Sequence, residues 1–162
     1  VVSYVRGVKY LGYSFYVMKG KCQLTVHPKS KAKMKSRLKE LTSRSNGWGY
    51  AKRKQKLKEY IRGWVGYYHL ANMKRLLLET EEWLRRRIRM CIWKAWKKVK
   101  TKVANLIICG ISKYQAYEWG NTRKGYWRIA DNPILKRAID NNKLRSAGYA
   151  TLMGTYLEWH PK

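Results

Sequence analysis

Acidic residues are scarce in this sequence, and their scarcity is the best guide to what the chain binds. The chain has 9 aspartates and glutamates against 37 lysines and arginines, a formal net charge of +28. A folded protein with this surplus repels itself unless an anionic partner neutralises it. Release of condensed counterions favours nucleic acid as that partner, and an anionic membrane surface is the alternative. A basic surface that serves only to keep the chain dissolved needs far less charge.

Long apolar runs and paired cysteines are also missing. No stretch approaches the roughly 20 apolar residues that a membrane-spanning helix needs, and no signal peptide is recognisable. The three cysteines, Cys22, Cys91 and Cys109, are widely spaced without a Cys-x-x-Cys pair, and we expect two of them to be small core residues. The three histidines show no ligand spacing, so no metal site is expected. These absences predict a reducing cytoplasm and no membrane partner.

The residue sets that support catalysis are absent as well. Nucleotidyl transfer by two metal ions needs at least two carboxylates on adjacent strands, whereas residues 1–27 contain no acid. No glycine-rich phosphate loop precedes a helix, and no Ser-His-Asp arrangement is apparent. His27, directly before Pro28, is interpreted as a strand-end residue rather than a base. We therefore expect no catalytic residue and no cofactor in this chain. Because the sequence begins at Val1 without an initiator Met, we expect it to be a fragment.

The N-terminal residues alternate in the manner of a β-hairpin. Residues 8–17 are β-branched and aromatic, with apolar character on both faces, which predicts a largely buried strand. A turn is predicted at Met18–Lys21, after which Cys22, Leu24 and Val26 share one face of a second strand. A lone hairpin is marginal in water, so it must pack on later residues or on sequence outside the chain.

Helical spacing dominates the middle of the chain. Met34, Leu38 and Leu41 predict a helix that begins near Pro28 and ends at the Ser- and Gly-rich residues 43–49. A second helix buries an apolar stripe made of Leu57, Tyr60, Ile61, Trp64, Val65 and Tyr68. Residues 72–78 are predicted to form a short helical link.

Thr80 is predicted to be the N-cap of a third helix, with Glu81 and Glu82 in the first turn, where the helix dipole favours acids. The apolar seam of this helix is Leu84, Ile88, Cys91, Ile92, Ala95 and Val99. Beyond it, short helices are predicted at 113–119, 133–140 and 142–146, with Asn132 as an N-cap before Pro133. The expected fold class is mainly α, with an N-terminal β-hairpin (1–27), a three-helix bundle (28–102) and a small, mostly helical C-terminal segment (103–162).

Cations follow the polar faces of the first two helices. Residues 28–62 contain 13 lysines and arginines and two acids, Glu40 and Glu59. A solvated helix face normally mixes both signs, so we interpret these faces as surfaces for phosphate contact. Trp64, Trp83 and Trp93 fall on or beside the core seams and are expected in the core. The basic loop 120–125 between Trp119 and Trp127 has two open readings: it stacks on bases, or two buried indoles hold it in place.

Several motifs together resemble the thumb, or maturase-specific region, of group II intron reverse transcriptases. Tyr10-Leu11-Gly12-Tyr13-Ser14-Phe15 looks like the last polymerase block at the palm edge, which forms a strand, and His27-Pro28-Lys29-Ser30-Lys31 resembles the start of the thumb. Ile61-Arg62-Gly63-Trp64-Val65-Gly66-Tyr67-Tyr68 matches the family's Arg-Gly-Trp-x-x-Tyr-Tyr signature.

Two later stretches, Trp83–Arg89 and Trp93–Lys97, look like the arginine-rich third thumb helix. Gly125-Tyr126-Trp127-Arg128 is similar to the DNA-binding segment of the bacterial class C subgroup. The resemblance implies a thumb that grips the template–primer duplex and binds intron RNA to assist splicing. It also implies a C-terminal segment that contacts target DNA during retrohoming. The fingers and palm, with their Tyr-x-Asp-Asp site and its expected Mg²⁺, are absent, so polymerase activity by this chain alone is not expected.

The resemblance divides the cations between two ligands in the cytoplasm of a bacterium. Those expected to bind intron RNA are Lys29, Lys31, Lys33, Lys35, Lys52, Arg53, Lys54, Lys56, Lys58, Arg85, Arg86, Arg87 and Arg89. Those expected to bind target DNA are Arg123, Lys124, Arg128, Lys136 and Arg137. Three alternatives stay open: the thumb of another reverse transcriptase lineage, a self-standing structural RNA-binding protein, and a membrane-active amphipathic protein.

Overall fold

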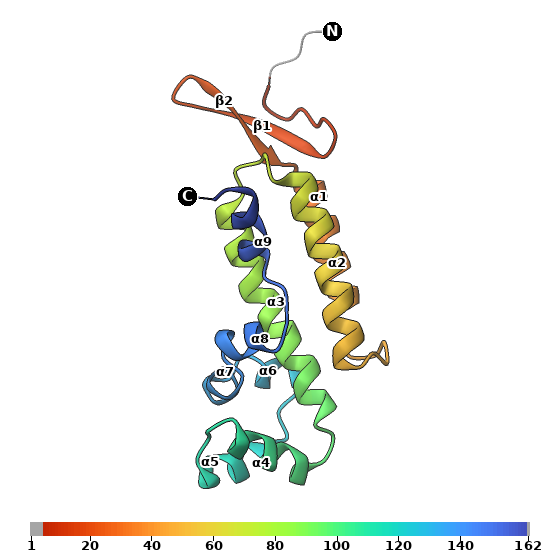
Figure 1. Ribbon diagram of the computed structural model, residues 1–162, viewed down its shortest axis with the longest axis vertical. Coiled ribbons are helices and arrows are strands. Elements are labelled where there is room, and N and C mark those ends of the chain that lie inside the picture. The colour runs from red at the N-terminus through yellow and green to blue at the C-terminus, as the bar shows by residue number, and fades with distance from the viewer. Residues whose placement is uncertain (1–4, 162) are drawn as a thin grey trace. The chain divides into compact units, whose positions relative to one another are not determined.

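The computed structural model describes residues 5–161, which form an N-terminal β-hairpin followed by helices (Figure 1). The expected fold class, mainly helical with an N-terminal hairpin, is confirmed. The described chain divides into two compact units. The first contains the residues up to Leu41, Tyr50–Glu81 and the segment from Ala150 onward; the second contains Thr42–Gly49 and Glu82–Tyr149. The domain boundaries expected after residues 27 and 102 stay predictions.

The hairpin pairs β1 (Tyr13–Met18) with β2 (Lys21–Val26) in antiparallel register, with Tyr13 opposite Val26 and Phe15 opposite Leu24. Its two turn residues, Lys19 and Gly20, have φ values of 51° and 73°. Two positive φ angles in succession make the tight turn whose twist matches that of the strands. The turn predicted at Met18–Lys21 is therefore confirmed.

The first strand begins later than the alternation predicted. Leu11 and Gly12 have φ values of 51° and 84° and form a turn, so Tyr10 joins only an isolated bridge to Tyr13. The expectation of a strand from residue 8, and through Tyr10–Gly12, is wrong. The left-handed backbone of these two residues interrupts a strand whose side chains would otherwise suit it.

The hairpin packs on later residues of the first unit, as its marginal intrinsic stability requires. The backbone N–H of Asn72 donates to the carbonyl of Leu24 at 3.0 Å, and the Asn72 side chain donates to the Tyr16 hydroxyl at 3.2 Å. The Tyr13 ring lies 5.2 Å from the ring of Tyr68, centroid to centroid. The Ser30 hydroxyl donates to the Gly12 carbonyl at 2.9 Å. These contacts join the hairpin to both of the helices that follow.

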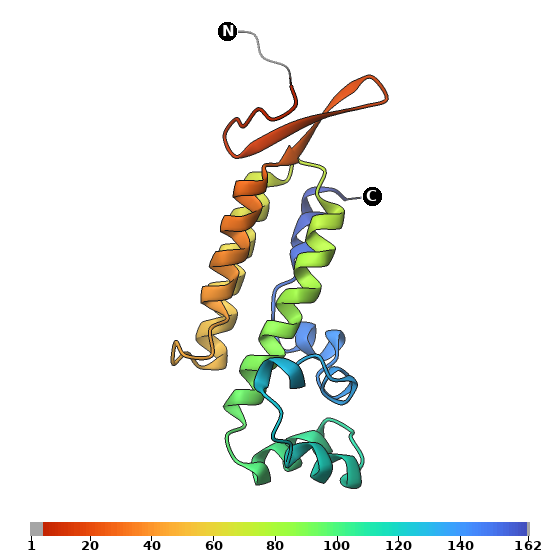
Figure 2. The same cartoon turned by 180° about the vertical axis from the view of Figure 1, so that it is seen from behind.

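Helices α1 (Pro28–Leu41) and α2 (Tyr50–Tyr68) lie side by side in both views of the first unit (Figures 1 and 2). The predicted stripes are confirmed for the side chains that are fully buried: Met34, Leu38, Leu41, Leu57, Ile61 and Val65. Tyr60, Trp64 and Tyr68 are half-buried at the edge of the stripe. Helix α9 (Leu152–Trp159) packs on α2, and its Tyr156 hydroxyl donates to the carbonyl of Ala71.

Helix α3 is one continuous helix, Lys74–Ala95, rather than a short link followed by a capped helix. Thr80 therefore lies inside the helix, where it is buried, and the predicted N-cap is wrong. Residues 74–79 are mostly strong helix formers, which carries the helix through this point. The predicted seam is also too long, because the helix stops at Ala95 and Val99 begins α4 (Val99–Ile108). This break allows Val103 and Leu106 to reach the core of the second unit.

The second unit contains α4 and four short helices around its own apolar core. These helices are α5 (Lys113–Gly120), α6 (Tyr126–Ile129), α7 (Pro133–Ala138) and α8 (Asn141–Ser146). Three of them match the predicted short helices, and α4, α6 and α9 were not predicted. Asn132 accepts from the N–H of Ile134 at 2.9 Å, so the predicted N-cap before Pro133 is confirmed.

Large buried side chains hold the second unit together. Trp93 is buried at 2% exposure beside Leu106 and Leu135, as expected for a core tryptophan. Trp83 is half-buried, as is Trp64 in the first unit. Of the cysteines, Cys91 is buried, Cys109 is half-buried and Cys22 is exposed. The expectation of two core cysteines therefore holds fully only for Cys91.

Candidate nucleic-acid interface

The cations of α1 and α2 lie on the faces opposite the buried stripe of the first unit. Two of the predicted residues, Lys31 and Lys54, are half-buried, and Arg53 is buried at 5% exposure. The other predicted lysines of these helices are exposed: Lys29, Lys33, Lys35, Lys52, Lys56 and Lys58. The structure therefore places most of this predicted set on the surface and removes Arg53 from it.

Carboxylates cannot neutralise this surface. Glu40 pairs with Arg37 at 2.7 Å, and Glu59 pairs with Lys56 at 3.5 Å. Residues 28–62 hold 13 cations and two acids, so 13 − 2 leaves an excess of 11 positive charges. The first turns of α1, α2 and α3 contain no acid, although the helix dipole favours one there. Such a surplus is compatible with a compact fold when an anionic partner screens it.

His27 joins the hairpin to α1 and caps the N-terminus of that helix. Its Nδ1 atom accepts from the backbone N–H of Lys29 at 3.1 Å, and its carbonyl accepts from the N–H groups of Ser30 and Lys31. Loss of hydration, followed by the charges of Lys9 and Lys29, lowers the pKa of His27. His27, which the sequence analysis interpreted as a strand-end residue, therefore also caps the start of α1.

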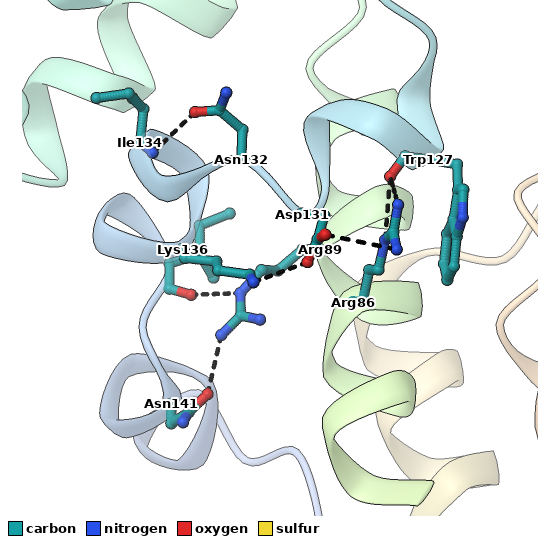
Figure 3. A network of polar contacts seen from close by, with 9 residues as sticks. Arg86, Arg89, Trp127, Asp131, Asn132, Ile134, Lys136 and Asn141 are labelled. Atoms are coloured by element: carbon teal, nitrogen blue, oxygen red, sulfur yellow. Dashed lines mark hydrogen bonds and ion pairs between the residues drawn. The ribbon is translucent and has the colours of Figure 1, made fainter. Parts of the chain in front are cut away.

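Arginines of α3 organise the second unit through backbone carbonyls (Figure 3). Arg86 stacks over the Trp127 ring at 3.8 Å and donates to the Trp127 carbonyl at 2.9 and 3.2 Å. Arg89 donates to the carbonyl of Ile139 at 2.8 Å and to the Asn141 side chain at 2.9 Å. Burial lowers the pKa of Arg89, which is 5% exposed. Its guanidinium group holds the fold and has no surface on which to meet a phosphate.

Asp131 links the arginine tract of α3 to α7 within the same unit. Its carboxylate accepts from Lys136 at 2.7 Å and lies 3.6 Å from Arg86 (Figure 3). The hydrogen bond from Lys136, with the nearby arginines, lowers the pKa of Asp131. Lys136, a predicted DNA contact, is therefore already paired with a carboxylate. Its side chain nevertheless remains exposed to solvent.

The basic loop 120–125 carries exposed cations between two fixed indoles. Arg123, Lys124 and Arg128 are exposed, and the Lys124 ammonium lies 4.9 Å above the Trp119 ring. Trp119 is half-buried beside Leu106 and Ile129, and Trp127 is held by Arg86. The reading of two buried indoles is wrong, because Trp127 is 37% exposed. Stacking of the loop on bases stays a prediction.

A pocket that the sequence did not predict lies in the second unit. It has a volume of about 260 Å³ and is lined by Ser43, Arg44, Ser45, Arg87, Met90 and Trp127. Arg87 is anchored by donating to the Thr42 hydroxyl at 3.1 Å and to its carbonyl at 3.0 Å. The sequence analysis named Arg87 and Trp127 for other reasons, and the Ser-Arg-Ser stretch at 43–45 looked like an ordinary helix break.

Residues 5–161 contain neither a cluster of metal ligands nor a membrane-spanning helix. Nowhere in that range do three His, Cys, Asp or Glu side chains come together as a metal site. Within the same residues, every helix is too short or too polar to span a bilayer.

Comparison with known proteins identifies the centre of the chain. No curated protein matches the sequence. Residues 31–110 match the family model described as the group II intron, maturase-specific domain. The matched range contains α2, α3 and α4 whole and most of α1, which together carry the cationic faces and the arginine tract. Residues 31–110 of this chain therefore belong to the family of group II intron maturase-specific domains.

Proposed function

We propose that this chain is the nucleic-acid-binding thumb and C-terminal region of a group II intron maturase and reverse transcriptase. In this proposal the first unit and the arginine tract of α3 bind group II intron RNA in the cytoplasm and thereby assist splicing. The second unit contacts target DNA or a template–primer duplex during retrohoming. Polymerisation itself would belong to fingers and palm, with their Mg²⁺ site, which are not part of this sequence.

The excess of 11 positive charges over residues 28–62 is the observation that carries the proposal. All of these cations except Arg44 stand on the two packed helices α1 and α2, so folding fixes the spacing of the backbone positions that carry them. Lysine suits such contacts because its ammonium group is a compact charge on a flexible stem that tracks phosphates without demanding one geometry. The maturase-specific family match favours intron RNA as the anion.

The assignment to DNA rests on the exposed cations of the second unit. Arg123, Lys124 and Arg128 project from loop 120–125 and α6, and Arg137 is exposed on α7. Arginine forks onto phosphate or guanine, which suits a duplex groove better than lysine does. Arg85, Arg86 and Arg87 stay in the proposed RNA-binding set, although each is half-buried, while Arg89 and Arg53 support the fold.

Paired charge reversals test the division. Lys33→Glu with Lys58→Glu alters α1 and α2, and Arg123→Glu with Lys124→Glu alters the loop; each pair changes the net charge by the same amount. We expect the first pair to weaken binding to a structured intron RNA by about tenfold or more. It should also flatten the salt dependence, because each lost phosphate contact reduces the slope of log affinity against log salt concentration by about 0.7–0.9. Binding to a DNA duplex should change little.

The second pair should show the opposite preference in the same binding titrations. Both variants should retain the thermal unfolding temperature of the parent, since all four side chains are exposed. If each pair weakened both ligands equally, the division between units would be wrong. If the parent chain bound neither ligand at low ionic strength, the function itself would be wrong.

A further inference from the structure

The pocket of the second unit contains two arginines and no carboxylate. Arg44 and Ser45 come from the segment between α1 and α2, Arg87 and Met90 come from α3, and Trp127 comes from α6. None of the six lining residues is acidic. Arg44 and Arg87 are close enough for the charge of Arg44 to contribute to lowering the pKa of Arg87, after the larger effect of burial. A site that brings two cations together in partial burial is suited to an anion.

The walls of this pocket are held in place by contacts outside it. Arg87, Cys91 and Lys94 recur at helical spacing on α3 and reach the segment that carries Arg44: Arg87 and Cys91 donate to Thr42, and Lys94 donates to the carbonyl of Arg44. The guanidinium group of Arg44 lies 5.0 Å over the Tyr126 ring. A pocket whose walls are fixed before binding loses little conformational entropy when its ligand arrives.

Trp127 supplies the aromatic surface. Arg86 stacks on its ring and donates to its carbonyl, which sets the orientation of the indole (Figure 3). The residue nevertheless stays 37% exposed, although Ile129 and Ala130 beside it are buried. An indole held at the mouth of a basic pocket, and left in contact with water, is placed to make contact with a nucleobase.

Volume limits the ligand. The pocket's volume of about 260 Å³ lies just below the roughly 300–1,000 Å³ that is usual for small-molecule sites. This is room for a phosphate with part of its sugar or base, and too little for a paired strand. Ser43 and Ser45 also line the pocket beside the arginines, and their hydroxyl groups are of the kind that hydrogen-bonds to the oxygens of a sugar-phosphate.

We infer that this pocket takes one unpaired nucleotide of the bound RNA, with its phosphate between Arg44 and Arg87 and its base against Trp127. The inference rests on the proposed RNA-binding function and adds to it a preference for a single-stranded position. All lining residues except Trp127 fall within the matched maturase-specific range, which is why RNA is chosen over DNA. Unpaired nucleotides are also where proteins read RNA most readily, because their bases are free to stack on side chains.

The test compares two RNA hairpins that differ by a single unpaired nucleotide, using the complete chain. The parent protein should bind the bulged hairpin about tenfold more tightly than the fully paired one, the size expected for one stacked base. Arg44→Gln and Trp127→Leu should each abolish this preference and leave the affinity for the paired hairpin within about twofold. Trp127→Phe should restore part of it, since an aromatic ring returns.

Arg145→Gln is the matched control, because it removes one exposed arginine from α8 in the same unit and away from the pocket lining. It should lower the affinity for both hairpins alike and keep the preference. A parent protein without preference, or an Arg44→Gln variant that loses affinity for both hairpins equally, overturns the inference and leaves the proposed function standing. Failure to bind either hairpin at low salt overturns both.

A third experiment distinguishes an RNA nucleotide from a free nucleotide as the ligand of the pocket. Adenosine monophosphate is titrated alone and as a competitor against the bulged hairpin. Weak competition that Arg44→Gln removes supports the pocket as the nucleotide site of an RNA chain. Tight binding of the monophosphate together with equal affinity for the two hairpins would assign the pocket to a free nucleotide and overturn its assignment to RNA.

Discussion

Neighbouring arginines of α3 have different roles because their depths differ. Arg85 and Arg86 are half-buried, whereas Arg89 is 5% exposed and donates to Ile139 and Asn141. A buried cation without partners is costly, so its hydrogen bonds to a carbonyl and an amide are part of the fold. Burial lowers the pKa of Arg89, yet an arginine keeps its charge throughout the ordinary pH range.

Replacement of Arg89 tests this structural role. Arg89→Ala should destabilise the chain by about 2–4 kcal/mol, because it removes charged hydrogen bonds and leaves the Ile139 carbonyl without its donor. Thermal unfolding followed by circular dichroism measures the loss, and Arg145→Ala on the exposed face of α8 is the control that should change little. An unchanged unfolding temperature for Arg89→Ala would return Arg89 to the nucleic-acid-binding set.

Gly12 is required for two separate reasons, its backbone conformation and its surroundings. Its φ is +84°, and a Cβ atom added there would lie 2.2 Å from the Tyr68 hydroxyl and 3.1 Å from the Ser30 Oγ atom. Gly20 has a similar φ of +73° with nothing within 4 Å. Alanine substitutions at Gly12 and Gly20 therefore distinguish the cost of backbone strain, common to both, from the cost of a steric clash, which only Gly12 has.

Gly20→Ala should cost about 1 kcal/mol, the price of a left-handed conformation for a residue with a Cβ atom. Gly12→Ala should cost about 2–4 kcal/mol, since the collision with Tyr68 is added to the same strain. Urea unfolding curves of the two variants give the comparison. Equal losses would mean that the hairpin moves away from α2 without cost.

At the level of elements, α1 begins in a way that couples its stability to pH. The neutral Nδ1 atom of His27 accepts from Lys29, and a protonated ring cannot accept there. The pKa of His27 is lowered in the folded chain, so its contribution is present above the ordinary value of about 6.5 and is lost as the pH falls through the lower folded value.

Unfolding temperatures measured between pH 7.5 and pH 5 should therefore fall more for the parent chain than for His27→Asn. Asparagine caps a helix without titrating in this range, so the variant removes the pH-dependent part of the decline. Carboxylates such as Asp131, whose pKa is lowered, lose their contribution at still lower pH and affect both proteins alike. Parallel curves for the two proteins would show that His27 does not cap α1 in solution.

For the whole molecule, the net charge of +28 governs how binding responds to salt. A protein that makes about 6–10 phosphate contacts loses roughly 10³–10⁵ in affinity between 50 and 200 mM salt. We expect this chain to show a loss in that range for structured RNA, measured by filter binding or fluorescence anisotropy. Binding that stayed constant as salt was raised would contradict an interface made of lysine–phosphate contacts.

Periodicity and charge in the sequence determined the hairpin, the buried stripes of α1 and α2, the Asn132 cap and the cationic faces. Each of these depends on residues close in the chain, where spacing alone decides which side chains share a face. The motifs of the family pointed to the maturase-specific domain, which the match over residues 31–110 bears out. The misplaced Thr80 cap and the late start of β1 were local errors, made where two backbone conformations were both open to the same residues.

Only the tertiary structure decided which cations are available. Arg53 and Arg89 look like their exposed neighbours in the sequence, but packing puts each at 5% exposure. The pocket formed by Arg44, Arg87 and Trp127 joins three segments up to 83 positions apart (127 − 44), and no local pattern records that distance. Burial and long-range contact arise from the way helices pack, so the sequence specified the charges and the fold selected those that can meet a phosphate.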